Sequence, residues 1–176
     1  MVENFKTLFF VKSSLICLYL ALTIPIPFFS NENLKIISIF AFTVGLLLII
    51  NITNDHVITC DDGISYKTSL ISKIFGKKGW KISWEEIVSI KSFSTSQGSK
   101  VHYFATKDSE NFLIPQRIEN FERFLTIISK KTKLKIKDIS YLSPLWTYKL
   151  LTFFSVLMIV WEIVAFKYQI LSMLNL

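Results

Sequence analysis

The alternation of apolar and polar stretches constrains this chain more than any other feature. Two apolar runs, Thr7–Phe29 and the seventeen-residue Leu34–Ile50, precede a long polar segment, and a third run extends over Leu145–Phe166. Runs of about 17–25 apolar residues are typical of transmembrane helices. The order therefore predicts an integral membrane protein with one extramembrane domain between its spans.

These runs divide the chain into three expected parts. Residues 1–51 form a transmembrane hairpin, residues 52–140 form the extramembrane domain, and residues 141–176 form a third transmembrane helix. Within the hairpin, the spans are expected at about 7–29 and 34–50.

Two alternatives concern the first and last runs. A signal peptide is an alternative for the first run, but the run is long for one, no Ala-x-Ala-like cleavage site follows it, and a second span comes at once. An interfacial position is an alternative for the last run, because Lys149 and Glu162 lie within it.

Basic residues are unevenly distributed over the chain. The net charge is +7, and residues 52–144 carry fifteen Lys and Arg against ten Asp and Glu. The turn Ser30–Asn33 is nearly neutral, whereas the N-terminal tail and the segment after Ile50 are basic. The positive-inside rule then predicts that the N-terminus and the central domain are cytoplasmic. A basic domain beside a bilayer favours anionic lipid over nucleic acid.

The central segment changes to a period of two residues, which is typical of half-buried strands. Ile64–Leu70 alternates apolar and polar residues directly after Asp62-Gly63, a strong hairpin signal. Further strands are expected at His56–Cys60, from Trp80, around Val88 and Ile90, at Val101–Thr106 and at Asn111–Ile114. Six short strands at this spacing predict an antiparallel sheet or a small barrel.

A tight corner is expected in the middle of this domain. Trp80, Ile82 and Trp84 share one face of an extended segment, and Glu85-Glu86 interrupts the alternation before it resumes. We therefore expect Trp80, Trp84 and Ile87 to define a corner between two strands.

The period changes again after Pro115. Phe121, Phe124 and Ile128 recur at helical spacing, and Lys130-Lys131 near the end of the segment suits the helix dipole. One amphipathic helix that closes an open end of the sheet makes the domain α+β.

Three stretches carry a family resemblance: the Asp62-Gly63 hairpin, the corner Ile82–Ile87, and Ile114-Pro115 leading into Phe121–Ile128. With two preceding spans, this layout resembles the bacterial pleckstrin-homology-like (bPH) membrane proteins. The resemblance implies a PH-like domain, which is a small antiparallel β-barrel or sheet capped by one C-terminal amphipathic helix. Transmembrane helices are expected on both sides of that domain.

A second resemblance is to the photosystem I assembly factor of cyanobacteria and plastids. Gly76–Lys78, Val88–Ile90, Leu113–Pro115 and the final helix fall in a comparable order after a two-helix hairpin. The third span departs from that pattern. This resemblance implies a role in assembling a membrane complex. Together the two resemblances imply a bacterial inner or thylakoid membrane.

Lysines are the main candidate binding residues. The segment before the third span contains Lys130, Lys131, Lys133, Lys135 and Lys137. A lysine near an anionic surface contributes about 1 kcal/mol, so this segment is either a lipid-headgroup contact or an ordinary topology signal. A possible basic loop contains Lys73, Lys77, Lys78 and Lys81. It lacks an arginine for bidentate phosphate binding, which favours an ordinary solvated loop.

Other polar residues give weaker signals. Glu162 lies in an apolar helix and is a candidate intramembrane partner contact, or a side chain that reaches the interface. His56, His102 and Cys60 match no zinc spacing. The sequence contains no Gly-rich phosphate loop and no nucleophile elbow. We expect no catalytic, cofactor or metal site and no enzyme activity.

The expected function is binding. The central domain would present its surface to another membrane protein or complex, in a scaffold or assembly role. The alternatives are an assembly factor for a photosystem or similar complex, an anionic-lipid-binding module, and a small transporter or channel subunit suggested by Glu162 alone. No nucleic acid, cofactor or small-molecule substrate is expected.

Overall fold

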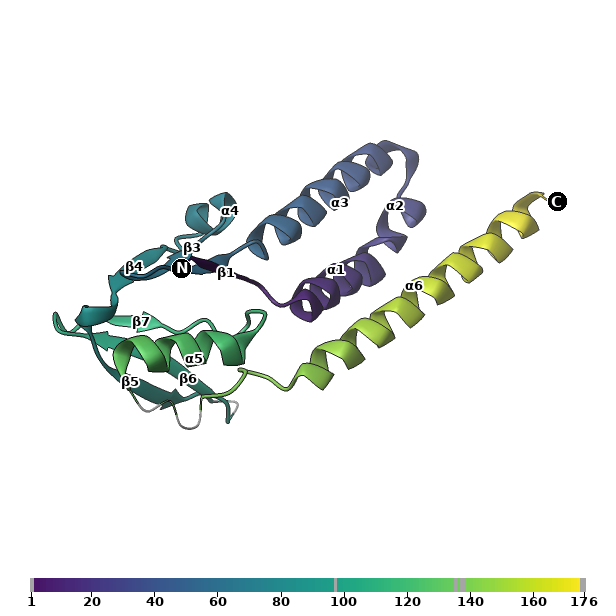
Figure 1. Ribbon diagram of the computed structural model, residues 1–176. Coiled ribbons are helices and arrows are strands. Elements are labelled where there is room, and N and C mark those ends of the chain that lie inside the picture. The colour runs from purple at the N-terminus through teal and green to yellow at the C-terminus, as the bar shows by residue number, and fades with distance from the viewer. Residues whose placement is uncertain (1, 97, 135, 137–138, 175–176) are drawn as a thin grey trace. The chain divides into compact units, whose positions relative to one another are not determined.

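The structure is a computed structural model that describes residues 2–96, 98–134, 136 and 139–174 (Figure 1). The chain divides into two compact units. The sheet unit comprises the residues up to Phe9 together with Asn51–Pro144, and the helical unit comprises Phe10–Ile50 together with the residues from Leu145 onward.

Four strands form the first antiparallel sheet of the sheet unit. They are β1 (Glu3–Lys6), β2 (His56–Thr59), β3 (Gly63–Lys67) and β4 (Trp80–Ser83), in that order across the sheet. Phe5 lies opposite Val57 and Ile64 lies opposite Ile82, and all four side chains are buried in the core. A Cβ at Gly63 would collide with the carbonyl oxygen of Ile82, so the close pairing of β3 with β4 requires glycine there.

Strand β1 precedes the helical hairpin in sequence, which the periodicity did not reveal. It pairs with β2, which follows the hairpin in the sequence, and Lys6 lies opposite His56. Thr7 then bridges Ile118, and the Leu8 N–H donates to the Arg117 carbonyl at 2.9 Å. The residues before the first helix therefore belong to the sheet unit rather than to the hairpin.

Three strands form a second antiparallel sheet. They are β5 (Ile87–Ser94), β6 (Lys100–Thr106) and β7 (Asn111–Leu113). The α+β class and antiparallel pairing are confirmed, but the barrel alternative is wrong for the described residues. Their strands form two separate sheets and close into no barrel. The consecutive strands β4 and β5 do not pair, and a short 3₁₀ turn, η1 (Trp84–Glu86), lies between them.

This turn is held by hydrogen bonds to a distant hairpin. The Ser83 N–H donates to Glu86 Oε2 at 2.8 Å, which caps the turn. The Trp84 indole N–H donates to the Cys60 carbonyl at 2.9 Å, and the Trp84 backbone N–H donates to Asp62. The buried indole thus joins the corner to the β2–β3 hairpin.

The expected strand over Ile64–Leu70 is wrong beyond Lys67. Ser69 instead caps a five-residue helix, α4 (Leu70–Ile74), by accepting a hydrogen bond from the Ser72 N–H. A capping serine stabilises a helix start, and here it outweighs the period-2 pattern. The other five expected strands correspond to β2, β4, β5, β6 and β7.

Helix α5 (Phe121–Thr132) supplies much of the core of the sheet unit. Phe121, Phe124 and Ile128 are buried on one face of this helix, as their spacing predicts. The Phe124 ring meets Phe5 of β1 edge to face, with centroids 5.4 Å apart. Arg123 of α5 forms an ion pair with Glu3 of β1 on the surface. The first strand is therefore fastened to the last helix of the same unit.

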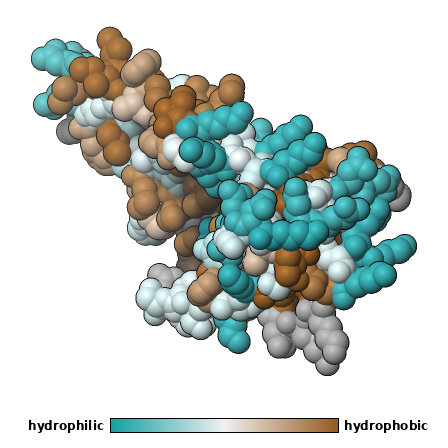
Figure 2. Space-filling view, turned by 90° about the vertical axis from the view of Figure 1, so that its left-hand side faces the viewer, coloured by the Kyte–Doolittle hydropathy of each residue, from teal (hydrophilic) through white to brown (hydrophobic). Residues whose placement is uncertain are grey.

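The helical unit contains three apolar segments that are long enough to cross a membrane. They are Phe9–Phe29, formed by α1 (Phe9–Thr23) and α2 (Pro25–Phe29), then α3 (Glu32–Ile52), and Leu145–Tyr168 within α6 (Leu145–Leu174). Pro25 separates α1 from α2, because proline cannot continue a helix without disturbing it. Figure 2 shows apolar side chains over the helices and hydrophilic ones gathered on the sheet unit.

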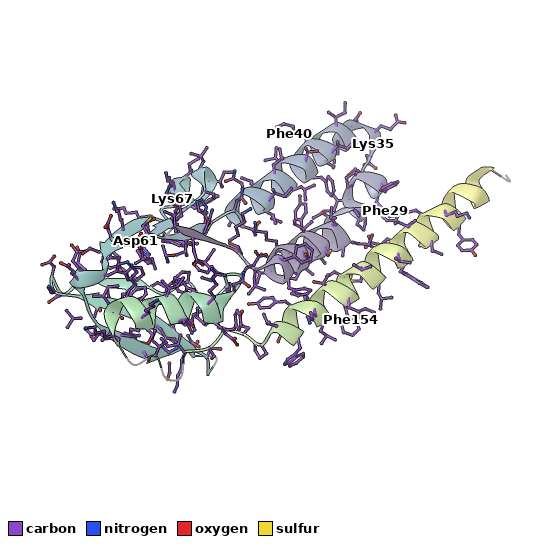
Figure 3. All side chains as sticks on the ribbon, viewed as in Figure 1. Phe29, Lys35, Phe40, Asp61, Lys67 and Phe154 are labelled. Atoms are coloured by element: carbon purple, nitrogen blue, oxygen red, sulfur yellow. The ribbon has the colours of Figure 1, made fainter. Side chains whose placement is uncertain are left out.

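Small and aromatic residues pack these helices together. The Tyr19 hydroxyl donates to the Phe42 carbonyl at 2.8 Å, and a Cβ at Gly45 would collide with that hydroxyl. Ser14, Ala21 and Ser155 are almost fully buried, as expected where helices approach closely in a membrane. Larger apolar side chains such as Phe40 and Phe154 point outward (Figure 3). Such exposure of apolar surface suits lipid rather than water.

Candidate functional site

One face of the second sheet presents aromatic and aliphatic side chains outward. Tyr103 lies opposite Lys91 on one neighbouring strand and Leu113 on the other. Phe93 lies opposite Val101, and its ring meets Tyr103 edge to face with centroids 5.6 Å apart. Phe93 is 53% exposed and Leu113 is 47% exposed. These four apolar residues are called the sheet patch: Phe93, Val101, Tyr103 and Leu113.

The opposite face of the same strands belongs to the core. Phe104, next to Tyr103 in sequence, is fully buried, so the sheet patch is an additional apolar surface rather than an edge of the core. Lys91 and Lys100 are exposed beside it. An apolar centre with a charged rim is the usual composition of a protein-binding surface, and the positive rim would complement acidic residues.

A buried carboxylate organises the other sheet. Asp55, directly before β2, is 6% exposed. Its two oxygens accept hydrogen bonds from the Tyr66 hydroxyl at 2.7 Å, the Ser69 N–H at 2.8 Å and the Ser72 hydroxyl at 3.3 Å, and Lys77 forms an ion pair with it. These five residues are called the Asp55 cluster. It holds α4 and the following loop against the start of β2.

The cluster perturbs the two acidic groups within it. Burial alone would raise the pKa of Asp55, but the hydrogen bonds from Lys77, Ser69 and Tyr66 outweigh burial and lower that pKa. Burial, and then the hydrogen bond to Asp55, raises the pKa of the Tyr66 phenol. Asp55 is therefore ionised and Tyr66 is neutral at pH 7, which makes the cluster a structural ion pair.

Comparison with known proteins gives one informative match. No family model matches the chain. The "Uncharacterized protein slr0269" of the cyanobacterium Synechocystis sp. is 30% identical over 154 residues, which cover 84% of this chain and 77% of the relative. The chain belongs to the same family as this protein. The match to slr0269 assigns no activity. The function of this slr0269-family chain therefore has to be inferred from its exposed residues.

The lysines of the segment from Lys130 to Lys137 differ in their environments. Lys130 and Lys131 lie in the last turn of α5, and Lys133 follows directly. Lys131 donates to Asp61 Oδ1 at 3.0 Å, so it joins α5 to the β2–β3 hairpin. Lys135 and Lys137 lie outside the described residues. The lipid contact expected of this segment stays a prediction.

The four lysines of the expected basic loop also differ in their environments. Lys77 is held in the Asp55 cluster, and its ammonium group lies 5.2 Å from the centre of the Tyr66 ring. Lys73 in α4, Lys78 after it and Lys81 on β4 are exposed. One of the four lysines therefore has a structural role, and the other three remain accessible.

The expected corner residues differ in burial. Trp84 and Ile87 are buried, whereas the half-buried Trp80 has its ring centroid 5.6 Å from that of Phe112. Glu162 lies in α6, where its Oε2 has no hydrogen-bond partner among the described residues. Its role as a partner contact stays a prediction.

Neither a metal site nor the Asp55 cluster emerges from the sequence pattern. Within the part of the chain that the structure describes, no three His, Cys, Asp or Glu side chains gather into a metal-binding group. His56 lies on β2 and His102 lies on β6, in different sheets.

The Asp55 cluster was missed because its members are 11 to 22 residues from Asp55. The weak signal was a single acidic residue before a strand, facing a lysine-rich segment.

Proposed function

We propose that this chain is a membrane-anchored, non-enzymatic binding protein with a PH-like domain. In this proposal the sheet patch binds another integral membrane protein, and the chain acts as a scaffold or assembly component. The sheet patch is the observation that carries the proposal, because it is a contiguous apolar face outside the core of the sheet unit.

The PH-like assignment is supported by the order of elements. Four antiparallel strands, three antiparallel strands and an amphipathic helix follow one another, as the bPH resemblance implies. The difference is that the helical hairpin is inserted after β1. An inserted hairpin leaves the sheets intact, because residues 7 and 55 remain joined by the Thr7 hydroxyl hydrogen bond to the Asp55 carbonyl.

The membrane location is supported by the three long apolar helices and their outward-facing apolar side chains. Pairing of β1 with β2 requires that both ends of the hairpin lie on one side of the membrane. Two crossings by the hairpin satisfy this requirement. The excess of lysine in the central segment then favours the cytoplasmic side.

Photocrosslinking in native membranes tests the proposal. A benzophenone amino acid in place of Phe93 is expected to crosslink to one defined membrane protein. The matched control is the same replacement at Phe75, which is also an exposed phenylalanine of the sheet unit but lies outside the sheet patch. Leu113→Ser should reduce the Phe93 crosslink severalfold. Identical products from both positions, or no protein product from Phe93, would contradict the proposal.

Assembly of a photosystem complex is the second candidate. It is supported by the resemblance of the hairpin and strand order to the photosystem I assembly factor, and by the cyanobacterial source of the relative. In that case the crosslinked partner is a photosystem subunit. A partner from an unrelated membrane complex would remove this candidate while leaving the scaffold proposal in place.

A further inference from the structure

Helix α4 buries the polar side chain of Ser72 and leaves most of its apolar side chains exposed. Leu70, Ile74 and Phe75 are 74%, 81% and 71% exposed, whereas Ser72 is 3% exposed. A short surface helix of a soluble domain normally has the opposite arrangement. Ser72 faces inward because its hydroxyl reaches Asp55. The three exposed residues, called the α4 patch, therefore have no place in the core of their own unit.

The α4 patch lies beside the end of a membrane-competent helix. Asn51, in the last turn of α3, accepts a hydrogen bond from the Ile71 N–H through Oδ1 at 3.2 Å. Asn51 and α4 both belong to the sheet unit. Where α3 crosses a bilayer, its last turn lies at the lipid–water boundary, and this hydrogen bond keeps the start of α4 next to that turn.

The exposed charge around α4 is positive, whereas the ionised Asp55 beneath the helix is buried and paired with Lys77. Gly63–Trp84 contains five lysines and no acidic residue. Lys73 and Lys78 are exposed and form no ion pair among the described residues. Apolar side chains flanked by lysines are the typical composition of a segment that lies in the interface of an anionic membrane.

The size of the α4 patch favours lipid over protein. Three apolar side chains on one helical turn and the next residue cover much less than the roughly 800 Å² that each partner buries in a stable protein interface. Contact with lipid needs no such area when the chain is already anchored, because the tether makes docking intramolecular.

We infer that the α4 patch inserts into the anionic lipid interface of the membrane that holds the helices, with Lys73 and Lys78 contacting headgroup phosphates. This inference rests on the membrane anchoring in the proposed function and adds a second attachment point. It is independent of the sheet patch, which lies on β5, β6 and β7 rather than on α4. Docking would fix the orientation of the sheet unit on the bilayer.

Spin labelling of the full-length protein in vesicles tests the inference. Phe75→Cys is labelled with a nitroxide after Cys17→Ser and Cys60→Ser remove the native thiols. In vesicles of phosphatidylglycerol and phosphatidylcholine, the label at 75 should collide more often with oxygen than with a water-soluble nickel chelate. A label at Ile74→Cys should give the same result, which guards against one disruptive substitution. The matched control is Phe93→Cys, which should remain accessible to the nickel chelate.

Charge and anchoring are tested separately. Lys73→Gln together with Lys78→Gln should lower the docking constant about 25-fold, since each lysine near an anionic surface contributes about fivefold. Equal immersion in pure phosphatidylcholine would overturn anionic lipid as the occupant. A label at 75 that behaves like the label at 93 would overturn docking itself, as would spin–spin broadening from a second copy. A label at Phe40→Cys in α3 reports insertion: exposure to water there would refute the anchoring proposal instead.

Discussion

Replacement of Asp55 by asparagine tests whether one carboxylate holds α4 to the sheet. Asparagine has almost the same shape, but it lacks the charge that faces Lys77 and can no longer accept hydrogen bonds on both side-chain positions. Tyr66 and Lys77 share one carboxylate oxygen, whereas Ser69 and Ser72 share the other. The substitution therefore leaves at least one inward-facing donor of the cluster without an acceptor.

The magnitude follows from burial and from the number of donors. A hydrogen bond to a charged group contributes about 1.5–3 kcal/mol, and the contributions within one cluster do not add fully. Lys77 is 52% exposed, so its ion pair adds little beyond the buried bonds. We expect Asp55→Asn to lower the free energy of unfolding by about 2–4 kcal/mol. With a urea m value of about 1–2 kcal/mol/M, the midpoint should fall by about 2 M.

Urea unfolding in mild detergent, followed by tryptophan fluorescence, measures this change. Trp146→Phe and Trp161→Phe in every variant confine the signal to Trp80 and Trp84 of the sheet unit. Tyr66→Phe is the matched control: it removes one neutral donor but leaves the carboxylate satisfied by the others, so it should lower the free energy of unfolding by about 1.5 kcal/mol, less than Asp55→Asn. An unchanged midpoint for Asp55→Asn at pH 7 would refute the structural role of the cluster.

The pH dependence gives an independent check. Because the pKa of Asp55 is lowered in the folded protein, its contribution to stability is complete above the unfolded pKa of about 3.9 and disappears as the pH falls through the folded value. The difference between wild type and Asp55→Asn should therefore be constant from pH 7 to about pH 5 and shrink below about pH 4. A difference that does not begin to shrink below about pH 4 would show that the charge of Asp55 is not the cause of the loss.

Two further substitutions test the core. Phe5→Ala should lower the free energy of unfolding by about 3–5 kcal/mol, because Phe5 is buried against Phe124. Hydrogen exchange of the β2 amides should become faster in this variant. Unchanged protection of these amides would mean that β1 contributes little to the sheet. Trp84→Phe should cost about 1–3 kcal/mol, because it removes the indole hydrogen bond to Cys60, as measured by the urea midpoint in near-UV circular dichroism. Trp80→Phe, at a half-buried ring, is its control and should cost less.

The sequence predicts elements whose signals are local. Apolar length locates the three long helices, and period-2 alternation locates five strands together with the corner at Trp84. Helical spacing identifies the buried face of α5. Each of these signals lies within the residues that form the element, so it needs no knowledge of a distant partner.

The elements that were missed depend on distant partners. Strand β1 has four residues and one buried apolar side chain, Phe5, and its pairing strand is separated from it by three helices, α1, α2 and α3. Helix α4 forms because Ser69 caps it and Asp55, fourteen residues away, binds that cap. The barrel alternative failed for a similar reason, since alternation along strands does not determine which strand edges pair.

Pairing of β1 with β2 has a consequence for biosynthesis. The first strand emerges from the ribosome before the hairpin, yet its partner is synthesised only after α3 is complete. Until then Phe5 has no core to enter, and the sheet cannot close. If the hairpin inserted with a single crossing, β1 and β2 would be on opposite sides of the membrane and the sheet would lack its outer strand. With the proposed membrane anchoring, completion of the sheet would act as a check on correct insertion, because a misinserted chain would expose the unpaired edge of β2 to cellular proteases.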